Sequence, residues 1–310
     1  MSDNAKGYSA ALLYAFIIGL SFMFVKIALK YSSSLDLLAH RFTLAFICIA
    51  VPILVGKFKL NISIKDFLKL SPLALFFPIT FFLFQTFGLE LVPSSEAGII
   101  QATAPIFTII FAFLLLREKI NYKQGFSVFL SVGGVIFISL INGANMADFN
   151  IWGTIFILSS TLATAIYSVL TRKYVSNYSL YDFTFVMTSL GFIAFNISAI
   201  VEHLVLGTWS LSGFYAPLAD RNFVIAVIYL GIPSSFMTGF LVNYSLKKIE
   251  ASRMSIFNNL AVVIAIVAGA VFLNETIFWY HIVGAVMITV GVFGVSIFGS
   301  NQNALNKNTR

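Results

Sequence analysis

The side chains that could do chemistry in this sequence are few, and they do not group as the residues of an enzyme do. Of 310 residues, 12 are Asp or Glu, 3 are His and 1 is Cys. The lone Cys48 excludes an internal disulfide and a Cys-based metal site, and His40, His203 and His281 lack metal-ligand spacing. No Gly-Lys-Ser/Thr motif is present to hold ATP phosphates. The sequence therefore predicts no cofactor, no metal and no catalytic residue.

Composition predicts that the remaining polar side chains lie in a membrane protein. The chain is 59% hydrophobic and 10% charged, whereas a soluble domain carries about 25% charged residues. Its apolar runs are roughly 20 residues long, which is the length of a spanning helix, and they lack the alternation of barrel strands. The predicted fold class is all-α integral membrane, with ten transmembrane helices. They are expected at about 9–30, 36–56, 70–90, 96–116, 124–142, 152–173, 181–206, 222–247, 253–273 and 278–299.

The basic residues predict the orientation of these helices. With the N-terminus in the cytoplasm, most of the 19 Lys and Arg residues fall in cytoplasmic segments, and only Lys30 and Arg221 fall in outer loops. The positive-inside rule then places both termini in the cytoplasm of a multi-pass cell (plasma) membrane protein. The net charge of +7 is explained by topology and by lipid head groups, so the bilayer is an expected partner and nucleic acid is not.

An internal duplication divides the chain. A shift of 157 residues superposes Ser95 on Ser252, Glu118 on Glu275 and Gly134 on Gly291. The predicted domains are a first five-helix repeat at 9–142, a second at 152–299 and a disordered cytoplasmic tail at 300–310. Because five is odd, the repeats must be inverted, which is the architecture of secondary transporters with a midplane site.

Three charged residues in or beside the spans are candidates for a gate or a substrate contact. Lys26 could meet a substrate carboxylate or counter-ion, or it could extend to the outer head groups. Arg41 could bind a carboxylate, or it could pair structurally with Glu96, Glu90 or Asp36. Glu96 opens a helix, so it either complements the helix dipole, with Ser94 or Ser95 as N-cap, or forms an outer gate with Lys26 or Arg41. The matched acids Glu118 and Glu275 are interpreted as interfacial anchors.

Uncharged polar residues in the third and fourth spans of each half are candidate cavity walls. Their amides and hydroxyls suit the amino and carboxyl groups of a zwitterionic small molecule. The alternative is hydrogen bonding between helices. These candidates are Gln85, Gln101, Asn243, Tyr244, Asn258 and Asn259.

Prolines and aromatic residues extend this candidate site. Pro105 lies mid-span, where it should bend the helix and free a carbonyl near residue 101, and Pro78 and Pro233 are expected to act similarly. Tyr167 could line an apolar chamber with Trp152, Tyr244 and several Phe residues, or these rings could pack in the core and against lipid. Gly134, Gly284 and Gly291 predict close helix packing.

Several local patterns resemble the drug/metabolite transporter superfamily, specifically its EamA-type members, over nearly the whole chain. They are Gly19-x-Ser21-Phe22-x-x-x-Lys26, Arg41-Phe42, Ser95-Glu96-Ala97, Ala104-Pro105 and Leu116-Arg117-Glu118. The chain lacks the Trp common before Gly19, and the second copy has Val262 in place of the proline. The resemblance implies a ten-helix transporter of small organic solutes, often an exporter of amino acids or related metabolites. It also implies a cavity lined by the first, third and fourth helices of each half.

The expected function is therefore a secondary transporter that exports small organic metabolites, amino acids or related amphipathic solutes, by alternating access. No acid is visible at the midplane to carry a coupling proton or sodium ion. The alternatives are an uncoupled facilitator or channel-like protein, and an integral-membrane enzyme, for which no acid–base pair or nucleophile is found. The substrate, the coupling ion and a homodimer are left open.

Overall fold

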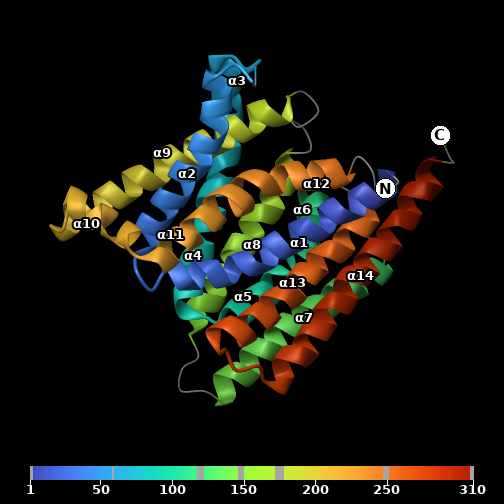
Figure 1. Ribbon diagram of the computed structural model, residues 1–310. Coiled ribbons are helices and arrows are strands. Elements are labelled where there is room, and N and C mark those ends of the chain that lie inside the picture. Colours follow the sequence, from blue (N-terminus) through green and yellow to red (C-terminus); the bar gives the residue numbers. More distant parts are fainter. Residues whose placement is uncertain are drawn as a thin grey trace.

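The computed structural model describes residues 3–57, 59–116, 122–145, 150–171, 178–246 and 251–307, and within them every regular element is a helix (Figure 1). The first half contains α1 (Asp3–Ala28), α2 (Ser34–Leu54), α3 (Ile64–Ala74), η1 (Leu75–Thr80), α4 (Phe81–Leu91), α5 (Ser94–Gln101), α6 (Ala104–Leu116) and α7 (Tyr122–Asn145). The second half contains α8 (Ile151–Thr171), α9 (Leu180–Leu206), α10 (Leu211–Tyr215), η3 (Ala216–Ala219), α11 (Arg221–Tyr229), η4 (Leu230–Met237), α12 (Thr238–Leu246), α13 (Ala251–Leu273) and α14 (Trp279–Lys307).

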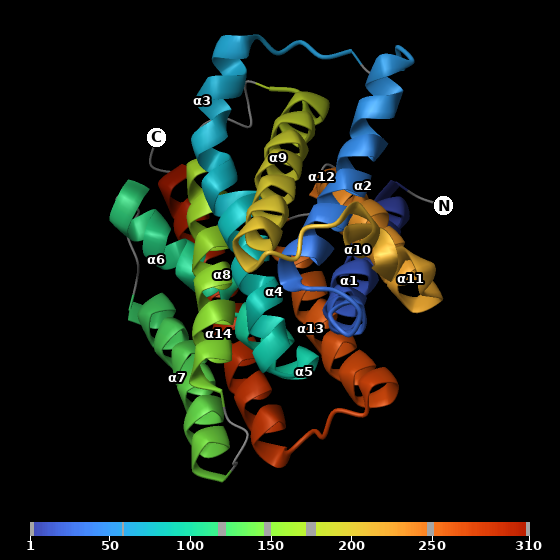
Figure 2. The same cartoon turned by 90° about the vertical axis from the view of Figure 1, so that its left-hand side faces the viewer.

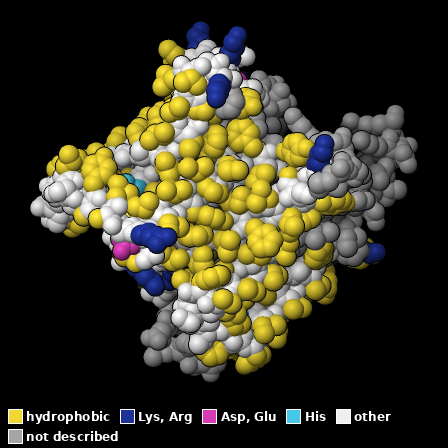
Figure 3. All heavy atoms as spheres, viewed as in Figure 1, with side chains coloured by type: hydrophobic (Ala, Val, Ile, Leu, Met, Phe, Trp, Pro, Cys, Tyr) yellow, Lys and Arg dark blue, Asp and Glu magenta, His cyan; other side chains and the backbone are white. Residues whose placement is uncertain are grey.

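Many of these helices have the length and apolarity of membrane spans. Among the described residues, seven helices are long and apolar enough to cross a bilayer, and three shorter apolar helices lie at 122–138, 260–273 and 279–294. A broad apolar surface covers one face, with charged side chains near its edges (Figure 3). The structure thus confirms an all-helical protein of membrane character, while the count of ten spans and the side of the termini remain predictions.

Hydrogen bonds between distant loops identify two ends of the helix bundle. At one end Asn222 donates to the Tyr31 hydroxyl over 3.0 Å, and Ser34 donates to Glu90. The charge pattern predicts that this end faces outward, so it is called the predicted outer end. At the other end, the predicted inner end, the amide of Asn61 donates to Asp182 over 2.9 Å. Successive loops along the chain therefore lie at opposite ends of the bundle, and every second loop lies at the same end, as the predicted topology requires.

Glycines let pairs of helices approach closely. A Cβ on Gly134 would lie 2.9 Å from the Gly284 carbonyl oxygen, and one on Gly291 would lie 2.6 Å from the Ser127 carbonyl oxygen. These contacts bring α7 and α14 together side by side, and the predicted role of the glycines is confirmed (Figure 1). Gly19 brings α1 onto α13 in the same way, with a Cβ only 2.6 Å from the Ala261 carbonyl oxygen.

Apolar packing joins the two halves. One large cluster of buried side chains draws on both, with Phe22 and Ile99 from the first half and Ile157 and Phe223 from the second. A smaller aromatic cluster holds Phe42, Phe82 and Phe195, and α9 lies between α2 and α3 (Figure 2). Burial in these clusters fixes the helices that carry the polar site.

Two segments differ from the sequence prediction. The tail was expected to be disordered from residue 300, but α14 continues to Lys307. Once a long helix has formed, each further residue adds a hydrogen bond at little cost, so a polar sequence can extend it. The outer loop expected at 207–221 contains α10 and η3, with Ser210 accepting from the Gly213 amide as an N-cap.

Candidate functional site

A cavity of about 450 Å³ lies between helices of both halves. It extends from the middle of the bundle, at Phe42 and Ser235, toward the predicted inner end, at Ser179. Its walls come from α2, η1 and α4 in the first half, and from α8, α9, η4 and α12 in the second. This is the size and placement of a small-molecule site between helices of a bundle.

The walls of the cavity are aromatic rings and hydroxyl groups. The rings form a connected set, in which Phe77 lies 5.0 Å from Tyr167 and 5.3 Å from Phe82 between centroids. The aliphatic hydroxyls belong to Thr171, Ser179, Thr184, Thr188, Ser235 and Thr238, and Tyr167 and Tyr178 add phenolic hydroxyls. No charged side chain is among the described residues that line it. Such walls can stack on a planar apolar group and hydrogen-bond a few polar atoms.

Interrupted helices form two of these walls. In η1, a π-helical segment, Phe77 has non-helical backbone angles (φ −142°, ψ 119°) just before Pro78. In η4, also π-helical, Pro233 lies inside the helix. The two segments occupy corresponding positions in the third spans of the two halves, and the sequence predicted a bend at both prolines. Irregular backbone beside a cavity is typical of transporter sites.

The predicted bend near Pro105 is confirmed, but it lies outside the cavity wall. α5 ends at Gln101 and α6 begins at Ala104, so the helix is interrupted at 102–103. Beside the break, Gln85 donates to Gln101 over 3.2 Å, and Gln101 donates to Ser160 over 3.2 Å. Gln85 and Gln101 were predicted to line the cavity, but they hydrogen-bond to each other. This is the alternative considered for them, hydrogen bonding between helices.

Arg41 is almost completely buried, with an exposed fraction of 2%. Its Nε donates to Ser235 Oγ over 2.8 Å and a terminal nitrogen donates to Ser234 Oγ over 3.2 Å, while the guanidinium carbon lies 4.1 Å from the centroid of the Phe82 ring. Phe82 and Ser235 also line the cavity, so Arg41 lies directly behind its wall.

The structural ion pair considered for Arg41 is not formed by the described residues. Asp36 lies against His203, with Nε2 3.0 Å from Oδ2. Glu90 accepts from Ser34 at the predicted outer end, and Glu96 accepts from Thr154 over 3.3 Å. Each of these acids contacts a partner near the end of a helix, whereas Arg41 lies eight residues into α2. This difference in position explains why none of the acids meets the arginine.

The predicted outer end carries a second polar contact between the halves. Glu275, in the loop between α13 and α14, accepts from the Ser94 amide (2.6 Å), the Ser95 amide (2.9 Å) and the Ser95 hydroxyl (2.7 Å). The N-terminus of α5 is therefore capped by a distant carboxylate and not, as expected, by Ser94 or Ser95. Gly269 permits this, since a Cβ there would lie 2.3 Å from the Glu275 carboxylate.

Lys26 is half-buried near this cap. It interacts electrostatically with Glu275 and Glu90, and no ion pair within 4 Å joins it to either among the described side chains. The outer gate between Glu96 and Lys26 or Arg41 is likewise not formed in this conformation. The acids that Lys26 faces place its charge at the predicted outer end, away from the cavity.

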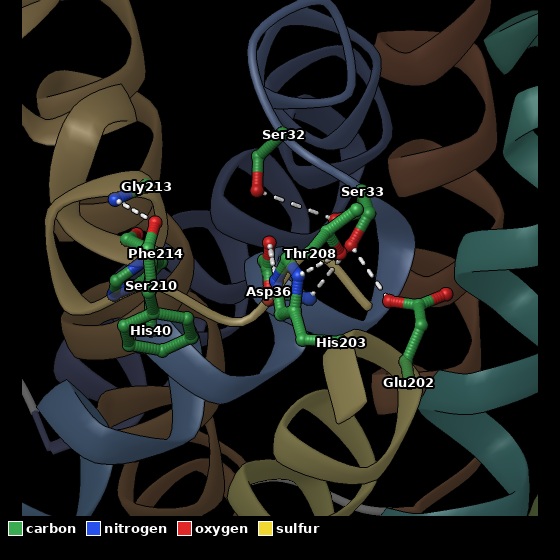
Figure 4. A network of polar contacts seen from close by, with 10 residues as sticks. All are labelled: Ser32, Ser33, Asp36, His40, Glu202, His203, Thr208, Ser210, Gly213 and Phe214. Atoms are coloured by element: carbon green, nitrogen blue, oxygen red, sulfur yellow. Dashed lines mark hydrogen bonds and ion pairs between the residues drawn. The ribbon is translucent and has the colours of Figure 1, made fainter. Parts of the chain in front are cut away.

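His40 and His203 also make contacts between helices. Figure 4 shows His203 between Asp36 and Thr208, and Ser33 donating to Glu202 over 3.1 Å. His40 approaches the Phe214 carbonyl oxygen at 3.0 Å. Within the described part of the chain, no group of His, Cys, Asp or Glu could hold a metal ion.

The remaining candidates divide into three groups. Tyr167 lines the cavity, as predicted. Tyr244 and Trp152 are exposed, by 42% and 62%, and line no described cavity. The side chains of Asn243, Asn258 and Asn259, like residue Glu118, lie outside the described part of the structure.

Sequence reasoning missed the residues that contact Arg41. Ser234 and Ser235 follow Pro233 directly, and this Pro-Ser-Ser run within an apolar span was the available signal. It also missed α9, whose Phe183, Thr184 and Thr188 line the cavity. The second span of each half thus contributes to the walls, whereas the resemblance implied the first, third and fourth.

Known proteins of similar sequence and fold place the chain in a family. The sequence profile of the EamA-like transporter family matches residues 5–140 and 151–297. The chain is 47% identical to the uncharacterized transporter YcxC of Bacillus subtilis (strain 168) over 296 residues, covering 95% of this chain and 94% of that protein. It is 29% identical over 275 residues to an uncharacterized transporter of Archaeoglobus fulgidus, with coverage of 89% and 93%.

The chain is also similar to a more distant relative and to a solved structure. Mouse solute carrier family 35 member G1 is 25% identical over 228 residues, which are 71% of this chain and 58% of that protein. A solved crystal structure with 16% identity superposes with a TM-score of 0.59 over 97% of this chain and 98% of that chain, which shows a shared fold. The cavity therefore lies in a membrane protein of transporter fold, and the chain belongs to the EamA-like transporter family.

Proposed function

We propose that this transporter exports small amphipathic organic metabolites, amino acids or related solutes, from the cytoplasm by alternating access. The observation that carries the proposal is the aromatic and hydroxyl-lined cavity between the two interrupted third spans, at η1 and η4. A cavity bounded by both halves changes its access when the halves move relative to each other. The charge pattern predicts cytoplasmic termini in a plasma membrane, and it thereby predicts that the Ser179 end of the cavity faces the cytoplasm.

Export is consistent with this arrangement. A solute from the cytoplasm would enter at the predicted inner end and bind among the rings of Phe77, Tyr167 and Phe183. The Glu275 cap on α5 then holds the two halves together at the predicted outer end, and outward opening requires contacts at this end to separate. The proposed transport path lies within one chain, because the described walls of the cavity all come from it.

Counterflow in proteoliposomes tests the function. Purified protein is reconstituted with a panel of labelled amino acids and cationic dyes, and exchange is measured against concentration. Saturable, stereoselective exchange is expected, whereas steady conductance in a planar bilayer would favour the channel-like alternative. Product formation from any panel solute would favour the enzyme. Lys26→Ala should retain exchange if Lys26 only stabilises the predicted outer end, and loss of exchange would assign it a substrate-linked charge.

A matched pair of variants on α9 ties exchange to the cavity. Thr188 lines the cavity and is buried, whereas Ile193 is 47% exposed on the outer surface of the same helix. Thr188→Trp should fill the cavity and abolish exchange, and Ile193→Trp should leave it unchanged. Equal exchange by the two variants would place the transport path elsewhere.

A further inference from the structure

The charge on Arg41 has no anionic partner among the described residues. Its hydrogen bonds go to the hydroxyls of Ser234 and Ser235, and its third contact is the face of Phe82. Hydroxyls and an aromatic face orient a guanidinium, but they carry no negative charge to neutralise it. A cation that is 98% buried within a membrane span, with no carboxylate beside it, is costly to keep and marks a functional site.

We infer that Arg41, which the hydroxyls of Ser234 and Ser235 hold until an anion replaces them, binds an anionic group of the transported solute, and that the solute is a small organic carboxylate with an apolar body. This inference rests on the proposed function and names the substrate class of the same cavity. Arginine suits the role because its planar fork of N–H donors matches the two oxygens of a carboxylate and it stays charged at any physiological pH.

The geometry connects the arginine to the cavity. Ser235 Oγ, 2.8 Å from Arg41 Nε, belongs to a residue of the cavity wall, and so does the Phe82 ring that the guanidinium covers. One terminal nitrogen of the guanidinium has no hydrogen-bond partner among the described residues, so it has donors to spare. A carboxylate at this end of the cavity would exchange the serine hydroxyls for a charged acceptor.

The end of the cavity in the middle of the bundle favours an anion with an apolar body over a cation. Its described walls contain no Asp or Glu to meet an ammonium group, and Arg41 contacts them there. The acids that contact the walls lie at the predicted inner end, where Asp182 accepts from Ser179 over 2.7 Å and Asp66 accepts from Tyr178 over 2.9 Å. The rings of Phe77, Tyr167 and Phe183 are positioned to hold an apolar substituent. An amino group on the solute would have to be satisfied by hydroxyls such as those of Thr184 and Thr188.

The position of the arginine also gives it access to both halves. It lies in α2 of the first half, about 10 Å along the helix from its start at Ser34, and its serine partners lie in η4 of the second half. An anion bound there would touch both halves at once. Binding of the solute would therefore change the contact between the two halves, which move relative to each other during the proposed transport.

Thermal unfolding of the full-length protein in detergent tests the inference with three probes that share one shape. Phenylacetate is anionic, phenylacetamide is neutral and phenethylamine is cationic; acetate and chloride are added as a minimal carboxylate and an inorganic anion at constant ionic strength. Phenylacetate and acetate should raise the Tm of the wild-type protein with concentration, and the amide and the amine should bind roughly 10- to 100-fold more weakly.

Three variants separate binding from structure. Arg41→Gln should reduce the apparent affinity for both carboxylates by roughly 10- to 100-fold, and Arg41→Lys should be intermediate. Ser235→Ala keeps the guanidinium and frees Nε, so its carboxylate response should persist. If Arg41→Gln does not fold, the wild-type, Arg41→Lys and Ser235→Ala measurements still decide the question.

Several outcomes would overturn the inference. The inference is wrong if no carboxylate raises the Tm of the wild-type protein, or if carboxylates raise the Tm of Arg41→Lys as much as that of the wild type. A rise in Tm with chloride alone would make this an inorganic-anion site. Counterflow distinguishes failure of the proposed function: exchange of amines and neutral solutes, unchanged in Arg41→Gln, would keep the transporter and reject the carboxylate. Arg41-dependent carboxylate binding without any exchange would keep the anion site and reject the transporter.

Discussion

The fourth spans of the two halves have related sequences but different shapes. In the first half the span is divided into α5 and α6 at residues 102–103, beside Pro105. In the second half α13 is continuous from Ala251 to Leu273, and Val262 occupies the position of the proline. Duplicated segments thus need not keep the same role: one fourth span bends next to polar side chains, and the other is a straight support.

The packing around α13 explains why it must stay an uninterrupted helix. Gly19 brings α1 against the Ala261 carbonyl, and one turn further along the same face of α13 Gly98 brings α5 so close that a Cβ would lie 2.9 Å from Ala265 Cβ. Both approaches need a regular helical surface along α13. The α5–α6 break instead lies beside Gln85, Gln101 and Ser160, whose hydrogen bonds form a polar contact between helices.

The comparison predicts its largest effect for a proline in the straight helix. Val262→Pro should lower the free energy of unfolding by at least about 3 kcal/mol, because it removes a backbone hydrogen bond and clashes with the preceding turn. Unfolding in mixed detergent micelles, followed by circular dichroism, measures this. The reciprocal Pro105→Val should change stability by less than about 1 kcal/mol, since valine fits either backbone.

Val262→Ala is the control, because it removes side-chain volume from a partly buried position without changing the backbone. If Val262→Pro is no worse than Val262→Ala, the continuity of α13 does not support the fold. If Pro105→Val abolishes counterflow while stability is kept, the bend in the first half serves movement, and the comparison gains a functional meaning.

The next effect concerns the cap that joins the two fourth spans. Glu275→Ala should lower the free energy of unfolding by about 2 kcal/mol, because it leaves two amides and a hydroxyl at the buried start of α5 without their acceptor. The control is Glu90→Ala, which replaces an exposed acid at the same end of the bundle that accepts from Ser34, with an expected loss below about 1 kcal/mol.

The same substitution tests the proposed closure of the predicted outer end. A single cysteine introduced at Ser95, in a Cys48→Ala background, should react faster with an impermeant thiol reagent when Glu275 is also replaced by Ala. Equal labelling rates with and without Glu275 would mean that the carboxylate caps α5 without holding the two halves together.

The smallest effect is expected at the amide pair beside the break. Gln101→Ala should cost about 1 kcal/mol, and a double-mutant cycle with Gln85→Ala should show a coupling of roughly 0.5 kcal/mol, typical of hydrogen bonds between membrane helices. Asn258→Ala is the matched change in the other fourth span. A coupling between Asn258 and Asn243 of similar size would show that the second half has an equivalent pair, so that the two fourth spans differ less than their backbones suggest.

The sequence predicted the local features of this protein well. Its apolar runs indicate helices of spanning length, and the prolines at 78, 105 and 233 fall where helices are interrupted. Gly134 and Gly291 indicate close packing that the structure confirms. These features are readable because solvation of the backbone in lipid and the missing amide of proline act within a few residues of their cause.

The polar contacts were predicted less well. The structural pair considered for Arg41 was with an acid, but Arg41 contacts Ser234 and Ser235, and Glu275 was interpreted as an interfacial anchor but caps α5. Each of these pairs is separated by about 180 residues or more along the chain. A charge in a sequence indicates that a partner is needed, but many serines and acids are available.

By itself, then, the sequence determined that the chain forms apolar helices, where they bend, and which ends carry positive charge, because those properties depend on composition and on near neighbours. Only the tertiary structure decided which side chains meet. It assigned two serines of η4 to Arg41, the carboxylate of Glu275 to the start of α5, and a cavity to the space between η1, α9 and η4. The physical reason is that these contacts depend on how helices pack across both halves, where fractions of an ångström at glycines such as Gly269 decide which groups can touch.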